Sequence, residues 1–490
     1  MVHVDLPINK TAEEPLYRQI IRLVRERIVE GSWVPGERLP GSRELADTLG
    51  ISRISVVNAY AELREEGLIV GQAGRGTFVT GPNGLTNDPR ALPSVAANPI
   101  AHVTQRHPPN VIAFSGGAPA EEFLPVSLIR QAYNAVLDRD GADALLYEET
   151  EGYLPLRQAI AEYSRTTGIN CRAEHVLITG GCQQALDMAV QALLSEGDAL
   201  ITTNPTYLGI LDLARVRRVQ VFGIPMDEDG IKIDALQEAL IHHRARAIYI
   251  APTYHNPTGT VMSIHRRRRL LQVAADFGVP VLEDGVYHEL GFAGTPPPPL
   301  KALDSEGIVL HTNGFSKIVL PGTRIGYVIG EGPVWERIMR VKRAADICTP
   351  TLNQRAMHYF LQTGALSGHL DRVRKIIRER RDSMIRSLQR HMPEGTRWST
   401  PTGGMYLWVE LPHNGPTVAE LYNNAIKQGV TFAMGPMFHT DGGGGYFMRL
   451  NFAAQAPDKI EEGVRRLRAA WHGLSAQNSG VVLRDTEHIL

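Results

Sequence analysis

Short apolar runs alternate with helical stretches through the middle of the chain, and this alternation restricts the fold more than any other pattern. Three such runs lie at residues 176–178, 247–250 and 279–282, and helical patterns occupy 182–195 and 266–277. Strands that alternate with helices usually form a parallel sheet, because each helix carries the chain back across the sheet. We therefore predict an α/β body with a mostly parallel sheet.

A different pattern begins near residue 395. Strand-like segments at 405–409 and 447–450 flank a helical stretch at 417–428, which is consistent with a smaller α+β lobe at the C-terminal end of the body. The last residues, 473–490, have no strong pattern, and we expect them to form a tail.

Composition restricts the class of protein. A chain of 490 residues exceeds what one hydrophobic core usually supports, so we expect two or three domains. The net charge of -1 argues against a surface built wholly to hold nucleic acid. The three cysteines have no metal-ligand spacing, and there is neither a long apolar run nor an apolar signal core. We expect a cytoplasmic protein with no metal site and no membrane segment.

The first 80 residues have a pattern of their own. Apolar side chains recur every four residues over 15–30, which marks one face of a helix. Ser42 can cap a short helix that stops at Gly50, and Ser52 can cap another that ends before Gly67. Two helices joined by a tight turn containing glycine are typical of a helix-turn-helix.

Two short strand-like runs follow these helices. Residues 68–70 and 77–79 are separated by a Gly-rich stretch and predict a hairpin, the wing of a winged helix-turn-helix. We place this domain at 14–81, an extended Pro-rich linker at 82–110, and the larger body at 111–472.

This first domain is not basic. Residues 11–80 carry nine Arg, ten Asp or Glu and no Lys, so DNA binding would depend on a few well-placed arginines. Arg53 starts the second helix, whose N-terminal side chains reach base edges, and it could pair bidentately with guanine. Arg43 is better placed for a phosphate. A second basic run at 265–269 opens a helix, and we interpret it as a solvated face.

A glycine pair stands between the strand at 176–178 and the helix after it. The stretch Thr179-Gly180-Gly181-Cys182-Gln183 would bring free backbone N–H groups and the positive end of a helix dipole together, which favours a phosphate. Taken alone, the pair could equally serve a simple tight turn. Tyr207, after Asn204-Pro205-Thr206, could stack on a planar ring or pack in the interior.

Four further side chains complete a chemical set in chain order. Asn256 supplies an amide donor in the sharp turn His255-Asn256-Pro257-Thr258-Gly259, and Asp284 and Tyr287 follow a strand of buried composition. Burying a polar group without a partner costs on the order of 2 to 7 kcal/mol, so a protonated ring nitrogen beside Asp284 makes physical sense. Lys317, in Asn313-Gly314-Phe315-Ser316-Lys317, supplies an amine.

These are the groups that pyridoxal 5'-phosphate needs: an amine for a Schiff base, an acid at the ring nitrogen, a donor to the ring hydroxyl and a phosphate cradle. Ser316 and Arg324 would hold the phosphate. Each piece has an ordinary structural explanation by itself, but the full set in one order does not. We therefore predict a pyridoxal 5'-phosphate site with Lys317 as its catalytic residue.

The series resembles the fold-type I, class I aminotransferases over about residues 110–472, including the stretches Phe114-Ser115-Gly116-Gly117-Ala118-Pro119, Glu151-Gly152-Tyr153-Leu154-Pro155-Leu156-Arg157 and Gly403-Gly404-Met405. The resemblance implies cofactor contacts at Gly181, Cys182, Gln183, Tyr207, Asn256, Asp284, Tyr287, Ser316, Lys317 and Arg324. It implies a substrate or effector site at Gly117, Asn256 and Arg449, in which Arg449 grips a carboxylate. Tyr147 would reach the phosphate of a partner subunit, which implies a homodimer.

One residue departs from this family pattern. Cys182 stands where Ser, Thr or Ala is common, so a hydroxyl contact to the phosphate would be missing.

The first domain resembles the GntR winged-helix family throughout residues 14–80. The matching pieces are Pro15-Leu16-Tyr17-Arg18-Gln19-Ile20, Gly36-Glu37-Arg38-Leu39-Pro40-Gly41-Ser42-Arg43-Glu44-Leu45-Ala46, Leu49-Gly50-Ile51-Ser52-Arg53 and Arg75-Gly76-Thr77-Phe78-Val79. The resemblance implies double-stranded DNA as a partner, with Arg43, Ser52, Arg53 and Ser55 near bases or phosphates and Gly76 at the wing tip. Ile54 departs from the Thr or Asn common there, so no sequence preference carries over.

The two domains together resemble the MocR-like regulators. That resemblance implies a transcription regulator whose aminotransferase-like domain senses pyridoxal 5'-phosphate or an amine or amino-acid effector. The stretch around Lys317 also looks like that of working aminoadipate or aromatic amino acid aminotransferases. An active aminotransferase with an appended DNA-binding domain therefore remains the alternative, as does a winged helix used only for protein contact.

Overall fold

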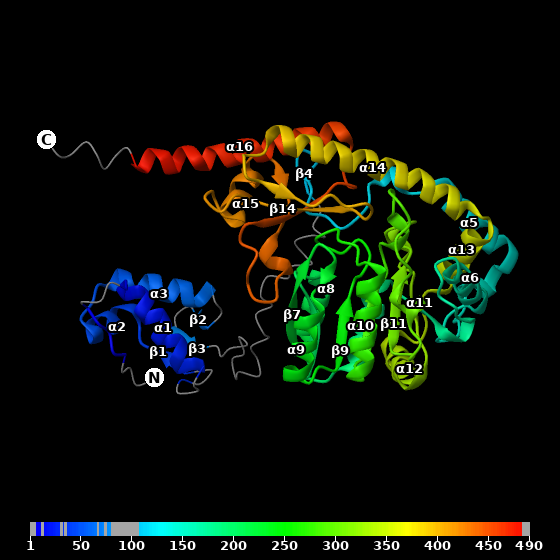
Figure 1. The fold of residues 1–490 in the computed structure, drawn as a ribbon, viewed down its shortest axis with the longest axis horizontal. Helices are drawn as coiled ribbons and strands as arrows, with labels where there is room; N and C mark the ends of the chain where they lie inside the picture. Colours follow the sequence, from blue (N-terminus) through cyan, green and yellow to red (C-terminus); the bar gives the residue numbers. More distant parts are fainter. Residues whose placement is uncertain are drawn as a thin grey trace. The chain divides into compact units, whose positions relative to one another are not determined.

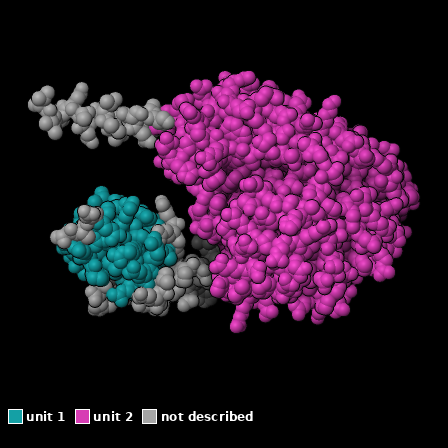
Figure 2. All heavy atoms as spheres, in the orientation of Figure 1, with its two compact units in different colours: residues 1–98 teal, residues 99–490 magenta. Residues whose placement is uncertain are grey.

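The computed structural model describes residues 6–10, 14–29, 33, 37–65, 68–72, 76–79 and 107–482. The chain divides into two compact units, residues 1–98 and 99–490 (Figure 2). The predicted linker at 82–110 lies, up to residue 106, outside the described residues. Within the described ranges we find no helix whose length and apolar character would let it cross a lipid bilayer.

Unit 1 has the predicted helix-turn-helix and wing. Its elements are α1 (Leu16–Val29), β1 (Arg38–Leu39), α2 (Ser42–Leu49), α3 (Arg53–Glu65), β2 (Ile69–Gln72) and β3 (Gly76–Val79). The hairpin of β2 and β3 is antiparallel, and β1 adds a third strand on the other side of β3. This strand of two residues is too short to carry an alternating pattern, so it was not predicted.

The caps of α2 and α3 differ in one respect from the prediction. Ser42 is the first helical residue of α2, and Gly41 precedes the helix, with its N–H donating to Glu44 Oε2 at 3.3 Å. Ser52 does cap α3, because its Oγ accepts the N–H of Ser55 at 3.3 Å. A one-residue shift of this kind is not visible in sequence, since a glycine and a serine are both acceptable at a helix start.

Unit 2 contains the larger sheet and the smaller lobe (Figure 1). Its helices are η1 (Glu121–Phe123), α5 (Val126–Asp140), η2 (Gly141–Leu145), α6 (Leu154–Arg165), η3 (Ala173–His175), α7 (Cys182–Leu193), α8 (Leu208–Arg217), α9 (Ile233–His243), α10 (Ile264–Asp276), η4 (His288–Leu290), α11 (Leu300–Leu303), η5 (Pro321–Thr323), α12 (Gly332–Asp346), α13 (Thr351–Gln362), α14 (Ala365–His391), α15 (Val418–Lys427), η6 (Gly435–Phe438) and α16 (Pro457–Val482). Its strands are β4 (Ile112–Ala113), β5 (Val176–Thr179), β6 (Ala199–Asn204), β7 (Gln220–Asp227), β8 (Gly230–Ile231), β9 (Ala247–Ile250), β10 (Val281–Asp284), β11 (Val309–Gly314), β12 (Gly326–Ile329), β13 (Arg397–Trp398), β14 (Tyr406–Glu410), β15 (Val430–Thr431), β16 (Ala433–Met434) and β17 (Phe447–Asn451).

The large sheet is mostly parallel, as predicted. Its strand order is β5-β12-β11-β10-β9-β6-β7-β8. The strands from β11 to β7 are parallel, whereas β12 runs antiparallel to both of its neighbours. The direction of β12 could not be predicted, because its short buried run would suit either direction.

Helices cover both faces of this sheet, which explains why its central strands are apolar throughout. Tyr249 and Leu282 pack with α7, α8 and α12 on one face. Ile248 and Val281, the residues just before them, pack with α9, α10 and α11 on the other. Successive side chains of a strand point to opposite faces, so a strand between two helical layers must be apolar at nearly every position.

The smaller lobe is built on a four-stranded antiparallel sheet, β13-β14-β17-β16. The helices α14 and α16 pack side by side above it (Figure 1). The lobe also takes in β4, which pairs with β15 from far along the chain. The prediction placed the whole lobe after residue 395 and did not include β4. Helix α16 continues to Val482, so the structure has helix where the tail was expected to begin at 473.

The interpretation of the basic run at 265–269 as a solvated face is wrong for Arg267, whereas His265, Arg268 and Arg269 are exposed. Arg267 is fully buried in α10, and its guanidinium donates to the carbonyls of Met262, Pro252 and Pro298 and to Thr253 Oγ1 at 2.8 to 3.0 Å. Arg268, the next residue, is exposed. Both are alike in sequence, and only the position on the helix separates them.

We predict that Arg267→Ala destabilises unit 2 by about 3 kcal/mol, because several buried acceptors lose their charged donor. Chemical unfolding followed by circular dichroism measures this change. Arg268→Ala, on the exposed face of the same helix, is the matched control and should change stability by less than about 0.5 kcal/mol. Equal effects of the two substitutions would contradict the structural role of Arg267.

Candidate functional site

The predicted site residues gather where several strands of the large sheet end. The turn after β5 leads into α7, Tyr207 precedes α8 after β6, Asp284 ends β10, and Lys317 follows β11 closely. Parallel strands end at one edge of a sheet, and ligands of open α/β sheets bind at that edge. Antiparallel β12 and the smaller lobe complete the surroundings.

The start of α7 forms a polar cradle. Gly181 has a φ of 94° and precedes α7, so the first N–H groups of the helix are free for an anion. Arg324 Nη2 donates to Gly180 O at 3.0 Å, and its Nη1 lies 3.4 Å from Ser316 Oγ. The φ of Gly181 favours glycine, and a Cβ there would lie 2.5 Å from Arg324 Nη2 and displace the guanidinium from the cradle. Helix N-terminus, hydroxyl and guanidinium together suit a phosphate.

The backbone beneath this cradle is equally tight. Gly326, on β12, faces Gly181 so closely that a Cβ would lie 2.5 Å from the Gly181 carbonyl carbon. The pair lets α7 approach the sheet and sets the height of the cradle over it.

Asp284 is a buried carboxylate with three donors. Tyr249 from the neighbouring strand donates to its Oδ2 at 2.9 Å, and Val286 N–H donates to its Oδ1 at 3.2 Å. Burial raises the pKa of Asp284 above its usual value, and these hydrogen bonds oppose the rise only in part. A cationic ring nitrogen beside Asp284 would therefore be favourable, because an opposite charge stabilises the ionised form that burial penalises.

Cys182 contributes the third donor to Asp284. Its Sγ lies 3.7 Å from Asp284 Oδ1 and 3.6 Å from Thr312 Oγ1, and burial raises the pKa of the thiol well above 9.0. The thiol is thus directed at the carboxylate and away from the cradle. The departure at Cys182 accordingly affects the floor of the site, where the sequence alone suggested a lost phosphate contact.

The amine of Lys317 lies at the centre of this group. Its Nζ donates to the carbonyl of Gly117, on the segment that follows β4. A Cβ at Gly117 would lie at ordinary contact distances from its neighbours, 3.8 Å from Lys317 Nζ and 3.6 Å from the Tyr406 hydroxyl. Two predicted residues from distant parts of the chain are therefore in contact.

Tyr287 forms a hydrogen-bonded pair with Tyr406. Their hydroxyl oxygens are 3.1 Å apart, and both rings are buried. Burial raises the pKa of Tyr406, but the cations of Arg449 and Lys317 outweigh it and hold this pKa below 10.0. Burial and the neighbouring Tyr406 raise the pKa of Tyr287. Either hydroxyl can donate in this pair.

Arg449 and Asn256 are hydrogen-bonded to each other. Arg449 Nη1 donates to Asn256 Oδ1 at 2.9 Å and Nη2 donates to Ser115 O at 2.7 Å. The guanidinium stacks over the rings of Tyr406 and Phe438, at 4.1 and 4.9 Å from their centroids. Arg449 is 1% exposed, and among the described residues it forms no ion pair and its Nε has no hydrogen-bond partner.

Tyr207 and Gln183 form the remaining wall. The Tyr207 hydroxyl donates to Gln183 Oε1 at 3.1 Å, and Gln183 Nε2 donates to Gly209 O at 3.3 Å. Burial raises the pKa of Tyr207, next to Asp284 and Cys182, so its phenol stays neutral. Its neighbourhood agrees with a ring-stacking role, which remains a prediction.

Tyr147 lies apart from these residues within one chain. Its side chain is 85% exposed, and it follows the exposed Leu145 and Leu146. This exposure is compatible with the expected reach into a partner subunit.

The predicted DNA-contacting residues lie on unit 1. Arg43 and Arg53 are exposed near the starts of α2 and α3. Ser55 is only partly free, because its N–H and hydroxyl both meet Ser52 Oγ, at 3.3 and 3.1 Å. Gly76 has a φ of 115° at the start of β3, a conformation that favours glycine.

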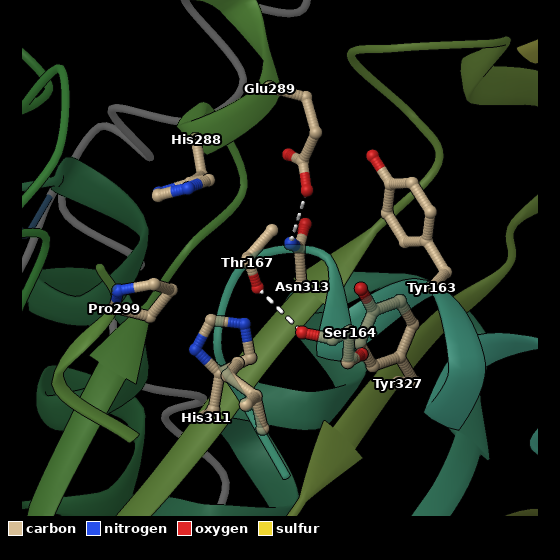
Figure 3. A pocket seen from close by; sticks show the side chains of 10 residues that line it. Tyr163, Ser164, Thr167, His288, Glu289, Pro299, His311, Asn313 and Tyr327 are labelled. Carbon is tan, nitrogen blue, oxygen red and sulfur yellow. Dashed lines mark hydrogen bonds between the residues drawn. The ribbon is translucent and has the colours of Figure 1, made fainter. Parts of the chain in front are cut away.

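A second polar cluster lies behind the site. His311, Asn313, His288 and Glu289 line a cavity of about 10 Å³ (Figure 3), room for about one water molecule. Glu283, next to Asp284, bonds His311 Nδ1 at 2.8 Å. The cavity is too small for a cofactor. The hydrogen bond between Glu283 and His311 supports the end of β10.

Sequence reasoning missed Tyr249 and Tyr406. Each stood inside an apolar run that was assigned as a strand, Ala247-Ile248-Tyr249-Ile250 and Met405-Tyr406-Leu407-Trp408-Val409. A buried tyrosine usually finds a partner for its hydroxyl. That rule would have marked both residues as polar members of a site without naming their partners.

Comparison with known proteins agrees with both parts of this structure. Residues 109–467 match the family model of aminotransferase class I and II, and residues 16–79 match that of bacterial regulatory proteins, gntR family. The chain belongs to the aminotransferase class I and II family and carries a gntR-type DNA-binding domain ahead of the aminotransferase-like body.

Full-length relatives share this organisation. The probable rhizopine catabolism regulatory protein MocR of Rhizobium meliloti is 28% identical over 98% of both chains. The uncharacterized HTH-type transcriptional regulator YdfD of Bacillus subtilis is 30% identical over 94% of this chain and 97% of its own. The solved structure of LysN, an alpha-aminoadipate aminotransferase from Thermus thermophilus, is 36% identical with a TM-score of 0.73, covering 78% of this chain and 96% of that one. Over nearly its whole length, the chain therefore shares the two-domain organisation of these HTH-type regulators.

The arrangement of side chains fits the cofactor of this family. The glycine cradle with Arg324 suits a phosphate, the buried Asp284 suits a cationic ring nitrogen, and the Lys317 amine lies within the same group. Family and site together assign pyridoxal 5'-phosphate as the cofactor.

We predict that Lys317→Ala loses the visible absorbance of the bound cofactor and its covalent trapping by borohydride. Asp284→Ala should weaken cofactor binding by roughly 10- to 100-fold, because it removes a charged contact. Tyr207→Phe keeps most of the stacking surface and should weaken it only a few-fold. Absorbance titration measures all three. A borohydride-trapped cofactor on another lysine of Lys317→Ala would contradict the assignment.

Proposed function

We propose that unit 2 senses pyridoxal 5'-phosphate together with an amine that carries a carboxylate, and that this binding changes the DNA affinity of unit 1. The observation that carries the proposal is the state of Arg449. A fully buried guanidinium without an acidic partner among the described residues is costly, and an anionic ligand would lower that cost. A carboxylate offers the planar, bidentate match that arginine prefers.

The amino group of such a compound would meet Lys317. An incoming amine would compete with Lys317 for the cofactor, and the carbonyl of Gly117 would be within reach of the Lys317 amine. Gly117, Asn256 and Arg449 are thus the proposed effector-binding set.

The segment that receives these contacts offers a connection to unit 1. Ser115 accepts from Arg449 and Gly117 accepts from Lys317, and both residues closely follow β4. Among the described residues of unit 2, β4 is the first strand after the segment that joins the units. Ligand contacts with Arg449 and Lys317 would therefore act on residues that are close in the sequence to the segment joining the two units. Regulation requires only that the ligand favour one arrangement of this segment over another.

We propose a homodimer that binds double-stranded DNA in the cytoplasm. Exposed apolar side chains at Leu145, Leu146 and Tyr147, with Val126 and Leu154 at the starts of α5 and α6, offer a surface that a second copy would bury. Tyr147 would then contribute to the partner's cradle, so two copies would complete each site. Two reading domains held by one dimer would add their weak DNA contacts.

The alternative function is aminotransferase catalysis with an accessory DNA-binding domain. It is favoured by the completeness of the site, since Lys317, Asp284, Tyr287 and Arg449 all lie together around the cradle. The two functions differ in what an amino compound does: it either changes DNA affinity or turns over.

We predict that one amino acid in a panel of amines and amino acids changes the DNA affinity of the cofactor-loaded protein by at least about 5-fold, a typical coupling. Arg449→Ala should abolish the response, because the carboxylate loses its buried partner. Anisotropy of labelled promoter DNA measures affinity, while absorbance follows the cofactor in parallel. Unchanged DNA affinity with every compound, combined with rapid turnover of one, would favour the enzyme over the regulator.

We also predict that Arg53→Ala weakens specific DNA binding by roughly 10- to 100-fold, the loss expected for one bidentate base contact. Arg22→Ala is the matched control, because Arg22 is a half-exposed arginine of unit 1 on α1, where it meets Glu26. Its removal should change binding little. Similar losses for both variants would indicate general charge attraction in place of base reading by Arg53.

A further inference from the structure

Two large apolar side chains are exposed on the helix that would read DNA. Ile54 is 70% exposed and Val57 is 43% exposed, and both lie on α3. Among the described residues of unit 1, they are the exposed large hydrophobic side chains. The opposite face of α3 is packed, with Val56, Ala59 and Leu63 buried in the core of the unit. The core is therefore complete without Ile54 and Val57.

These two side chains share their face with polar ones. Arg53 and Asn58 are exposed next to Ile54 and Val57, at the spacing that places residues on one side of a helix. Arginine and asparagine are side chains that pair with guanine and adenine edges. The matching group for an apolar side chain is the methyl group of thymine, which lies in the same major groove as those base edges.

The geometry of the helix suits two neighbouring bases. Residues three apart on a helix are about 4.5 Å apart along its axis, and base pairs are about 3.4 Å apart along a duplex. Ile54 and Val57 are β-branched, so their side chains are stiff and present fixed methyl surfaces. Ser52 holds the start of the helix through its bond to Ser55 N–H, which fixes where Ile54 is presented.

We propose that Ile54 and Val57 read thymine methyl groups at neighbouring base pairs, beside the base that Arg53 contacts. The proposal rests on the proposed DNA binding by unit 1 and gives it a sequence preference. An apolar side chain gains from contact with a methyl group. At any other base, an apolar side chain would cover polar edge atoms and remove their hydrogen bonds to water without replacing them. The other bases are therefore disfavoured at these positions.

The test removes single methyl groups from the DNA. Duplexes are first enriched from a random library on the full-length, cofactor-loaded protein. Each thymine of one enriched half-site is then replaced in turn by deoxyuridine, which lacks only the methyl group, and the affinity is measured by anisotropy at constant salt. We expect two neighbouring positions at which the replacement weakens binding by about 3- to 5-fold, the size typical of one buried methyl.

Two variants assign each methyl group to its side chain. Ile54→Ala should lose the sensitivity at one position and keep it at the other, and Val57→Ala should do the reverse. Each variant thus contains its own control for folding and for overall DNA binding, and alanine is well tolerated in an exposed helix.

Four results would overturn the proposal. Specific wild-type binding that is insensitive to every deoxyuridine would leave the DNA-binding function intact and remove the thymine reading. Equal sensitivity in wild type and both variants would do the same. A variant that changed the association state of the protein, with unchanged methyl sensitivity, would assign this face to a protein contact. Failure to enrich any duplex would remove the proposed DNA binding as well.

Discussion

Asp284 is a carboxylate buried at the carboxyl end of a central strand, and the surrounding elements are arranged to keep it there. Tyr249 and Val286 stabilise it by hydrogen bonds, and Cys182 approaches it from the start of α7. Those contacts require β9, β10 and α7 to end or begin at one edge of the sheet. The same edge then brings Lys317 near the cradle. Because a buried carboxylate without partners is costly, the site depends on these elements meeting at this edge.

Much of this architecture could be predicted because the physics behind it is local. Apolar runs such as β9 are recognisable since both faces of the sheet are covered, and Lys317 and Asp284 belong to motifs with a chemical purpose. What could not be predicted depends on distant partners. Tyr249 looked like another apolar residue until Asp284 lay beside it, and β4 showed no sign of its pairing with β15. Arg267 and Arg268 differ only in their positions on the helix, which place the first in the interior and the second on the surface.

In the proposed function, the DNA-binding domain and the aminotransferase-like body contribute different kinds of energy. With nine Arg and ten acidic residues over residues 11–80, unit 1 attracts DNA weakly at long range. Specific contacts must then supply a large share of the affinity, so in the proposed homodimer a small change in how the two copies are presented would have a large effect on the occupancy of the DNA site. A strongly basic domain would bind in any arrangement and would be harder to regulate.

The contact between Gly181 and Gly326 has a consequence for how such a chain can evolve. A side chain at Gly326 would meet the backbone at the start of α7, and one at Gly181 would meet the guanidinium of Arg324, so the first glycine serves the packing and the second serves the cradle. A lineage that gave up turnover in favour of signalling would still keep Gly326, because folding continues to select it. Catalysis can be lost through residues at the mouth of the site while the floor stays unchanged, and the ancestry of an enzyme then persists within a regulator.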